Sequence, residues 1–458
     1  MNTLPILKKN AYLTLLIKDN HIFANLAYTD FVAQKTYMLS DTTDLSPLKF
    51  RMDDIVFNGE FWFEYFNSLE KVLGWNIVDR QWQGVFKIVD FQDEGEGVSG
   101  IKILVDDNQP FFNKIYHSLK EFSKDIALRI VDDKYMKGII EGLRNRLGYE
   151  DILWVDIDLS HFTVYRSRDK QSSFGIFSKE RKKEREFSTS KISWGSEIGL
   201  IDSIKSSKLQ AFLSLESNSD NVMDRWANFV AHTPDYISDL NVEDILRSFV
   251  TIQNLSIFEN NREKFEAFGR GNSAIFVTGK LAKIMDRRNL LYSLIDGFEL
   301  EGMFDLFLDS ENRVVSYGRN LIEASLSEDI LVIKGDVLPS VSKVVIPHVN
   351  IFKGKNKVIF SGSIVSQDFE KIDIYAINPN LEIFNIPYKS NKVVVEGSLK
   401  SGAVLTHYPT TDISFISAHE GVIYDSLVVD CRIRPIVYGP KPKDNKIKLQ
   451  NWSNGNKK

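Results

Sequence analysis

Cysteine is nearly absent from this sequence, whose 458 residues include a single one, Cys431. One cysteine excludes a disulfide framework and any cysteine-rich metal site, and this usage fits a reducing compartment. Long hydrophobic runs are also missing. The apolar stretch over residues 11–17 is too short for a signal peptide, and no run reaches about 18 uncharged apolar residues. We therefore expect a cytoplasmic protein without a transmembrane segment.

Charge of one sign is not in excess either, since the formal net charge is only −5. This balance argues against a nucleic-acid partner, because a nucleic-acid-binding face carries a surplus of basic residues. The hydrophobic fraction of 43% is sufficient to build hydrophobic cores. A length of 458 residues exceeds that of one ordinary domain. The composition predicts two or three folded domains and no nucleic-acid binding.

Several short catalytic and nucleotide-binding motifs are absent. The chain has no G-x-x-x-x-G-K-[ST], no G-x-G-x-x-G and no G-x-S-x-G, which excludes the P-loop, the dinucleotide fingerprint and the hydrolase nucleophile elbow. The seven histidines show neither i, i+4 pairing nor an H-E-x-x-H spacing. These spacings argue against a zinc site.

A pattern of strands followed by helices is present, and it occurs twice. The first cycle begins with a strand, turn and strand over residues 10–40, and the second begins with the buried strand 152–158. The first cycle continues with helices over 60–74, 113–124 and 133–147 and strands over 84–90 and 100–106. The second continues with strands over 162–167, 173–178, 274–277 and 303–308 and helices over 197–217, 219–232, 242–268 and 281–297. The charged run 179–186 between them reads as a solvated loop or helix face.

Two such cycles in tandem are what an actin-type fold needs, and the C-terminal part differs from both. Over residues 330–438, short β-rich runs alternate with Gly, Asn and Pro turns, which predicts a separate all-β module. The predicted fold class is therefore α/β, an actin/Hsp70-like (ribonuclease H-like) two-lobe fold with an appended all-β domain. The expected bounds are 1–150 for the first actin-like lobe, 151–325 for the second, 326–440 for the β-rich domain and 441–458 for a polar basic tail.

The hairpin over residues 155–166, VDIDLSHFTVYR, is the candidate phosphate site of the second lobe. Asp156 at the strand end is placed to hold Mg²⁺, and Ser160 and Thr163 are candidates for the phosphate turn. A phosphate turn favours glycine, because the backbone must approach the anion closely, yet residues 158–161 contain none. Asp158 would also add negative charge beside a triphosphate. Nucleotide binding and a surviving structural hairpin both remain open here.

A third candidate element is the segment 274–284, AIFVTGKLAKI. A strand, the Thr278-Gly279 turn and a helix N-terminus form a usual site for the adenosine or phosphate of a nucleotide. Lys280 is positioned to approach a phosphate, although a solvated lysine is the simpler interpretation. The first-lobe turn, residues 17–21, again lacks glycine.

From about residue 150 onward, an ordered series of motifs resembles the glutamate mutase accessory family (GlmL/MutL-like), a divergent branch of the actin/Hsp70-type ATPases. Residues 155–164 lie on that family's V-D-V-G-G-A-T-T-D-V and keep Asp156. Residues 194–199, which include Gly195 and Glu197, resemble its E-G-D-L-G-x-R. Residues 277–282 resemble its G-T-G-G-V-L, and residues 427–436 its I-D-x-R-G-R-P-L. The resemblance implies ATP and Mg²⁺ as cofactors, nucleotide contacts from Gly195 and Glu197, and chaperone-like assistance to a cobalamin-dependent mutase.

The missing glycines point away from a full ATPase. They predict weak or absent ATP hydrolysis and no tightly bound nucleotide, hence a degenerate actin-like scaffold or accessory factor with a protein partner. One alternative is an active ATPase that remodels a client enzyme such as the mutase. Another is an FtsA/PilM-like scaffold of cell division or pilus assembly, although those relatives lack the long β module. We do not expect the basic tail to contact membranes, because it has no amphipathic apolar face.

Overall fold

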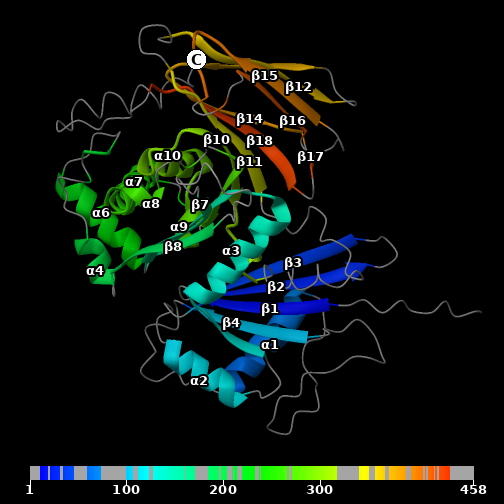
Figure 1. Cartoon of the computed structure of the whole chain (residues 1–458). Coiled ribbons are helices and arrows are strands. Elements are labelled where there is room, and N and C mark those ends of the chain that lie inside the picture. Colours follow the sequence, from blue (N-terminus) through cyan, green and yellow to red (C-terminus); the bar gives the residue numbers. More distant parts are fainter. Residues whose placement is uncertain are drawn as a thin grey trace, which may run out of the picture. The chain divides into compact units, whose positions relative to one another are not determined.

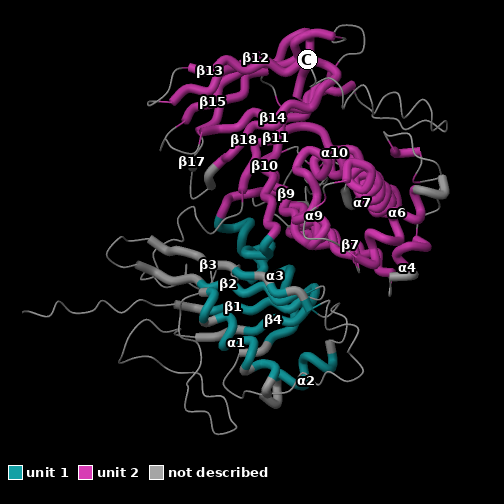
Figure 2. Tube along the Cα trace, turned by 180° about the vertical axis from the view of Figure 1, so that it is seen from behind, with its two compact units in different colours: residues 1–146, 311–339 teal, residues 147–310, 340–458 magenta. Residues whose placement is uncertain are grey.

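The computed structural model describes the following parts of the chain. It covers residues 11–18, 21–30, 35–45, 59–73, 100–106, 112–122, 127–159, 161–170, 184–194, 197–203, 209, 211–213, 219–232, 237, 239–265, 268, 271–316, 340–349, 356–366, 371–387, 393–405, 408, 411–416, 418–419 and 422–433. The expected strands over 84–90 and 173–178 and the tail 441–458 lie outside these residues. The chain divides into two compact units, one of residues 1–146 and 311–339 and the other of residues 147–310 and 340–458 (Figure 2).

The first unit is built on a five-stranded sheet in the order β3-β2-β1-β4-β5. Figure 1 labels β1 to β4 of this sheet. Its strands are β1 (Ala11–Lys18), β2 (His21–Asp30), β3 (Lys35–Asp44), β4 (Gly100–Asp106) and β5 (Ala127–Val131). The first three form an antiparallel meander, whereas β4 runs parallel to β1 and β5 parallel to β4. Short turns suffice for the meander, while the parallel strands require crossover connections.

The described helices of this unit each follow a strand; they are α1 (Gly59–Leu73), α2 (Phe112–Phe122) and α3 (Asp133–Leu147). The Asp132 carboxylate accepts a hydrogen bond from the backbone N–H of Tyr135 at 2.7 Å, which starts α3 as an N-cap does. Gly148, with φ +72°, follows its end. The helix boundaries agree with those expected from the sequence to within a few residues.

The second unit repeats the same topology inside a larger sheet. The segment β8-β7-β6-β9-β10 consists of β6 (Asp151–Ile157), β7 (His161–Lys170), β8 (Glu184–Ser193), β9 (Ser273–Thr278) and β10 (Gly302–Leu308). Here too the first three strands form an antiparallel meander and the last two run parallel to β6. The duplication confirms the predicted actin-like α/β fold class. Because β8 begins at Glu184, part of the charged run 179–186 is a strand rather than a loop or helix.

Helices of the second unit pack on one face of this sheet. They are α4 (Glu197–Asp202), α6 (Ser219–Ala231), α7 (Leu240–Asn260), α8 (Arg262–Phe265), α9 (Lys280–Ile284) and α10 (Arg287–Gly297). The hydrophobic core joins strand residues such as Val155 and Ile275 to helix residues such as Trp226 and Phe249. Among the described residues, no helix combines the length and the apolarity needed to cross a membrane.

The expected continuous helix over 281–297 is in fact two helices, α9 and α10. Asp286 separates them, because its carboxylate accepts hydrogen bonds from the backbone N–H groups of Arg288 and Asn289 and so caps α10. The expected helix over 197–217 is also shorter, since α4 ends at Asp202. Asp, Asn and Ser favour such caps over helix interiors because their side chains bond the backbone locally.

The β-rich C-terminal region contributes to two different sheets. Strands β11 (Ser340–Ile346), β14 (Leu381–Asn385) and β18 (Val422–Asp430) extend the large sheet beyond β10, and β17 (Ala418–His419) pairs with β18. Strands β12 (Val358–Ser366), β13 (Ile372–Ile377), β15 (Val393–Leu399) and β16 (Asp412–Ile416) form a separate antiparallel sheet. The region was expected to be a module of its own; among its described strands, only those of this four-stranded sheet pair apart from the second-lobe sheet.

A buried carboxylate links the added strands to the lobe. Asp305 of β10 lies opposite Lys343 of β11, and its Oδ1 is 2.5 Å from the lysine Nζ. Its Oδ2 accepts hydrogen bonds from the hydroxyls of Tyr149, at 2.6 Å, and Tyr424 of β18, at 2.8 Å. Burial, reinforced by the nearby Asp305 charge, raises the pKa of both tyrosines, so both hydroxyls stay protonated as donors.

Candidate functional site

The hairpin of β6 and β7 carries most of the residues that the sequence singled out. Asp156, the next-to-last residue of β6, lies opposite Thr163 in β7 and Thr278 in β9. Residues that pair across neighbouring strands share one face of a sheet, so these three side chains lie on the same face. Residues 152–155 and 157 of β6 are buried and apolar, as expected for a central strand with neighbours on both edges.

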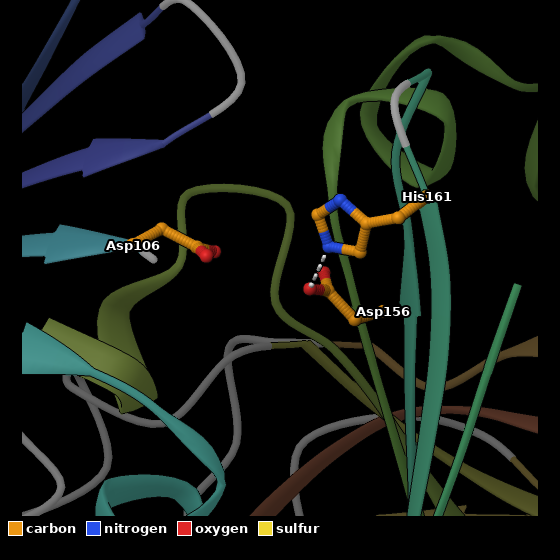
Figure 3. Close-up of side chains that lie close together, drawn as sticks. All are labelled: Asp106, Asp156 and His161. Atoms are coloured by element: carbon orange, nitrogen blue, oxygen red, sulfur yellow. Dashed lines mark hydrogen bonds and ion pairs between the residues drawn. The ribbon is translucent and has the colours of Figure 1, made fainter. Parts of the chain in front are cut away.

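The Asp156 carboxylate is bonded through both oxygens. Its Oδ1 accepts a hydrogen bond from Thr278 Oγ1 at 2.8 Å, and its Oδ2 lies 3.3 Å from His161 Nε2 (Figure 3). Thr278 Oγ1 accepts in turn from Trp154 Nε1 at 3.1 Å. A carboxylate that is only 7% exposed requires such partners, because burial without them would cost several kcal/mol.

Asp158 lies one residue beyond the end of β6 and reaches the start of α9. Its Oδ1 accepts a hydrogen bond from the backbone N–H of Lys280 at 2.5 Å, and its own N–H donates to the carbonyl of His161 at 3.0 Å. Backbone N–H groups at the start of a helix attract anions. The protein's own carboxylate therefore occupies the type of donor that a nucleotide phosphate uses.

Gly279 allows the turn between β9 and α9 to approach this hairpin. Its φ is +102°, and an added Cβ would lie 2.4 Å from the Ile157 carbonyl oxygen and 2.8 Å from Asp158 Oδ1. Neither the backbone angle nor the contact tolerates a side chain. The glycine predicted to admit a nucleotide thus brings two segments of the protein against each other.

The residues of this hairpin do not fit a bound triphosphate. The turn over residues 158–161 contains no glycine, and the Asp158 carboxylate lies on the Lys280 N–H. A phosphate at that N–H would have to displace Asp158 and would meet its negative charge in a buried setting, where like charges repel strongly. Carboxylate oxygens do suit a cation, so the role of Asp156 in holding Mg²⁺ stays a prediction.

Two other predicted residues of the second unit are buried. Lys280 is 9% exposed, so its interpretation as a solvated lysine is wrong. Thr163 is 1% exposed, and within the described part of the chain its hydroxyl has no hydrogen-bond partner. It lies within β7 rather than in the turn.

The structure does not describe the side chains of the remaining predicted residues. Ser160 and Gly195 lie outside the described residues. Glu197 is the first residue of α4, and its side chain is outside the described part. Contacts of these three residues with a nucleotide stay predictions.

Two residues that matter here were not singled out as a pair from the sequence. His161 has its ring nitrogen near both Asp156 and Asp158, and Asp158 caps α9. The spacing Asp-x-Asp-x-x-His across a strand end was the available signal. It does not match the helical i, i+4 pattern by which metal-binding histidines are usually sought.

The first unit has a corresponding hairpin. Lys18, the last residue of β1, lies opposite His21, the first residue of β2. Both are buried, and the His21 ring stacks on Phe23 with ring centroids 6.0 Å apart. Each hairpin therefore begins its second strand with a buried histidine, His21 or His161. In this unit β4 ends in a buried carboxylate, Asp106.

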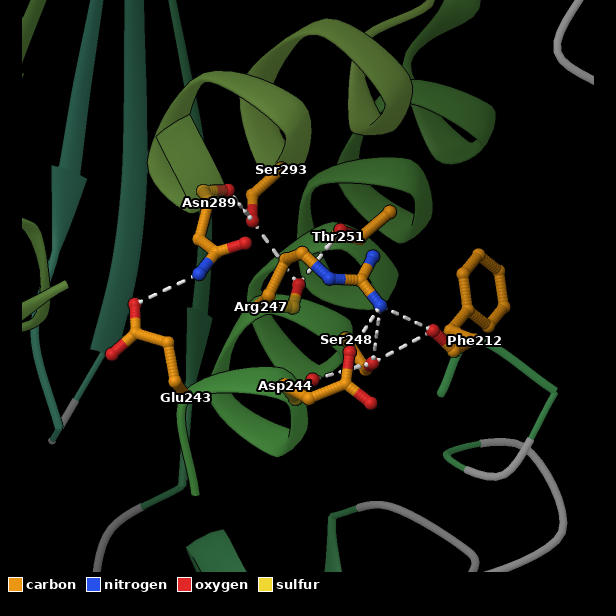
Figure 4. Close-up of polar contacts among 8 residues, drawn as sticks. All are labelled: Phe212, Glu243, Asp244, Arg247, Ser248, Thr251, Asn289 and Ser293. Atoms are coloured by element: carbon orange, nitrogen blue, oxygen red, sulfur yellow. Dashed lines mark hydrogen bonds and ion pairs between the residues drawn. The ribbon is translucent and has the colours of Figure 1, made fainter. Parts of the chain in front are cut away.

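A second group of polar residues lies between α7 and α10 (Figure 4). Glu243 Oε1 accepts hydrogen bonds from the backbone N–H of Asp286 at 2.7 Å and from Asn289 Nδ2 at 3.2 Å. Burial raises the pKa of this glutamate above its ordinary value. The contact caps α10 from a neighbouring helix, which is a structural role.

One turn further along α7, Arg247 ties the same helix to the loop before α6. Its Nη2 donates to the Phe212 carbonyl at 2.6 Å and to Asp244 Oδ1 at 2.8 Å. The hydroxyl of Ser293 in α10 donates to the Arg247 carbonyl at 3.1 Å (Figure 4). Buried polar groups need hydrogen-bond partners, and these bonds supply them where α7 packs against α10.

Comparison with known proteins gives neither a family nor a curated relative. No family model matches the chain, and no curated protein matches it.

Three solved structures illustrate the likenesses found. The Ppx/GppA family member of Aquifex aeolicus has a TM-score of 0.34 and 8% identity, covering 70% of this chain and 99% of its own. A non-polymerisable quadruple mutant of pCBH ParM has a TM-score of 0.34 and 11% identity, covering 68% and 97%. MreB 5 of Spiroplasma citri bound to AMPPNP has a TM-score of 0.32 and 12% identity, covering 69% and 97%. The assignment of an actin-like fold accordingly rests on the duplicated strand topology described above.

Proposed function

We propose that this protein is an actin-like scaffold or accessory factor that does not hydrolyse ATP and acts through a protein partner. The observation that carries the proposal is the 2.5 Å hydrogen bond from the Lys280 N–H to Asp158 Oδ1. The Asp158 carboxylate thus occupies the Lys280 N–H at the start of α9, a backbone donor of the kind that binds phosphate.

Phosphate release from ATP in the presence of Mg²⁺ tests the proposal. The full chain is expected to release phosphate no faster than an Asp156→Ala variant, because neither retains an ATP-hydrolysing site. Release that is well above the buffer rate and is abolished by Asp156→Ala would overturn the proposal. That result would favour the alternative of a working ATPase that remodels a client enzyme.

The identity of the partner is the finer part of the proposal. The ordered motifs from residue 150 onward favour an accessory role beside a cobalamin-dependent mutase, in which ATP and Mg²⁺ are no longer tightly bound. An adjacent mutase gene together with co-purification of its product would support this partner. Neighbouring pilus or cell-division genes would favour the FtsA/PilM-like scaffold instead.

A further inference from the structure

The four-stranded sheet of the C-terminal region has β13 as one of its edges. The strand order is β13-β12-β15-β16, so among the described strands β13 is paired on one side only, by β12. An edge strand presents a row of backbone N–H and C=O groups to which a further strand can bind. The side chains that the edge carries decide whether such pairing is favoured.

Apolar side chains of β13 are exposed to solvent. Ile374 and Ala376 are buried, whereas Ile372, Tyr375 and Ile377 are 46%, 53% and 43% exposed. These three belong to a set of only nine large apolar side chains that are exposed among the described residues. Exposed apolar side chains that gather on one element mark an interaction site.

The two edges of the larger sheet, β8 and β14, differ from β13 in this respect. Four of the ten residues of β8 are charged, and β14 is only five residues long. Neither strand has an exposed large apolar side chain among its described residues. Charge and short length are usual means of protecting an edge, whereas β13 has one charged residue, Asp373, and no proline. Of these edges, β13 is the one whose side chains favour pairing with another strand.

A second copy of the chain fits this edge. Two β13 strands related by a two-fold axis at Tyr375 run antiparallel, with Tyr375 opposite Tyr375 and Asp373 opposite Ile377. Facing aromatic side chains stabilise a strand pair, and this register opposes no like charges. Lys371 Nζ lies 3.4 Å from Asp373 Oδ1, so the charge of each edge is balanced and two copies do not repel each other there.

The size of this contact predicts a weak dimer. Six residues of extended strand span about 20 Å. A pair of such edges buries less than the roughly 800 Å² per partner that a stable interface requires. The dimer is therefore expected to form and dissociate with protein concentration.

We propose that β13 is a dimerisation surface, through which two chains join their four-stranded sheets into one continuous sheet. The pairing is antiparallel and places Tyr375 on the two-fold axis. This inference goes beyond the proposed function, because it names a second copy of the chain as a partner and is independent of nucleotide binding.

Sedimentation equilibrium of the full chain tests the proposal. The unaltered chain should show a reversible monomer–dimer equilibrium. Tyr375→Lys should weaken the dimer at least about 10-fold, because it sets two like charges directly opposite each other. Val72→Lys is the matched control, since Val72 is 61% exposed in α1, and it should dimerise as the unaltered chain does. Circular dichroism confirms that each variant is folded.

A cysteine at position 375 tests the register. The one cysteine of the chain, Cys431, is fully buried, so the introduced thiol is the accessible one. Directly opposed residues of antiparallel strands have Cα atoms about 4.5–5.5 Å apart, which a disulfide can span. Under mild oxidation Tyr375→Cys should give a covalent dimer, whereas Val72→Cys should not.

Several results would contradict this dimer. An unaltered chain that stays monomeric up to about 1 mM would overturn the proposal and leave the edge to a strand of another protein. An equally strong dimer in Tyr375→Lys, or equal cross-linking of the two cysteine variants, would overturn it as well. Dimerisation that appears only after removal of residues 441–458 would assign the edge to the chain's own tail instead. None of these outcomes affects the ATP result, because no nucleotide is present.

Discussion

Gly279 shows how one residue determines the geometry of the second-lobe site. We expect Gly279→Ala to destabilise the protein by about 1–3 kcal/mol, because alanine would be strained at positive φ and its Cβ would meet the Ile157 carbonyl. Gly138→Ala is the matched control. That glycine lies in α3 with nothing within 4 Å of the added atom, so the change should stabilise by about 0.5–1 kcal/mol. Urea denaturation measures both, and two shifts of the same sign would contradict the account.

Substitution of Arg432 tests the role of the buried ion pairs at the end of β18. Its guanidinium is fully buried and donates to Asp296 at 2.7 and 3.0 Å and to Asp430 at 2.7 and 2.9 Å. Arg432→Met should cost about 3–5 kcal/mol in the free energy of unfolding, because two carboxylates would be left buried without their partner.

The exposed pair of Arg225 and Asp239 provides the comparison for that change. Their side chains are 37% and 46% exposed, and the two lie 2.7 Å apart. Arg225→Met should cost less than about 1 kcal/mol. If chemical denaturation gave equal losses for Arg432→Met and Arg225→Met, the buried cluster would not have the role assigned to it.

At this residue scale, the sequence predicted part of the site. Asp156, Thr278 and Gly279 were predicted from strand ends and a Thr-Gly turn, and the structure brings them together. The role of Asp158 was not predicted beyond its charge, because its contact with Lys280 joins segments 122 residues apart. Long-range contacts of this kind have no local pattern.

At the scale of elements, the packing of α7 against α10 has a pH dependence. Burial raises the pKa of Glu243 from its ordinary value of 4.5. The contribution of Glu243 to the free energy of unfolding is therefore fully present below pH 4.5. It is lost as the pH rises through the raised pKa of the folded state. The Glu243→Gln variant mimics the protonated form at every pH. Its stability relative to the unaltered chain should therefore be higher at pH 7, where the unaltered chain has lost the contribution of Glu243, than at pH 4. Denaturation at pH 4 and 7 measures this, and a relative stability that is unchanged or higher at pH 4 would contradict it.

Element boundaries were predictable where the signal is local. The helix ending at Leu147 is followed by Gly148, and both hairpins of the duplicated lobes were expected. The break between α9 and α10 was missed, because the apolar pattern continues across Asp286 while the side chain caps the second helix. Capping competes with helix continuation, and periodicity alone does not decide between them.

At the scale of the whole molecule, the duplicated meander explains why the fold could be predicted without a sequence relative. Hydrophobic strands, short turns and following helices occur twice in order, and each set forms its own sheet. The membership of β11, β14 and β18 in the second-lobe sheet could not be predicted. Which edge a strand joins depends on contacts such as Asp305 with Lys343, which are distant in sequence.

We propose that Asp158 occupies the backbone donor at the start of α9 in place of a nucleotide phosphate, and ATP binding tests this proposal most directly. The melting temperature of the full chain is measured against ATP with Mg²⁺ over micromolar to millimolar concentration, beside an Asp156→Ala variant. Ligand at about 100 times its Kd would add about 2.7 kcal/mol of stability. The account predicts that the two melting temperatures respond to ATP in the same way, without a saturable rise. A saturable rise at micromolar ATP that Asp156→Ala removes would contradict it.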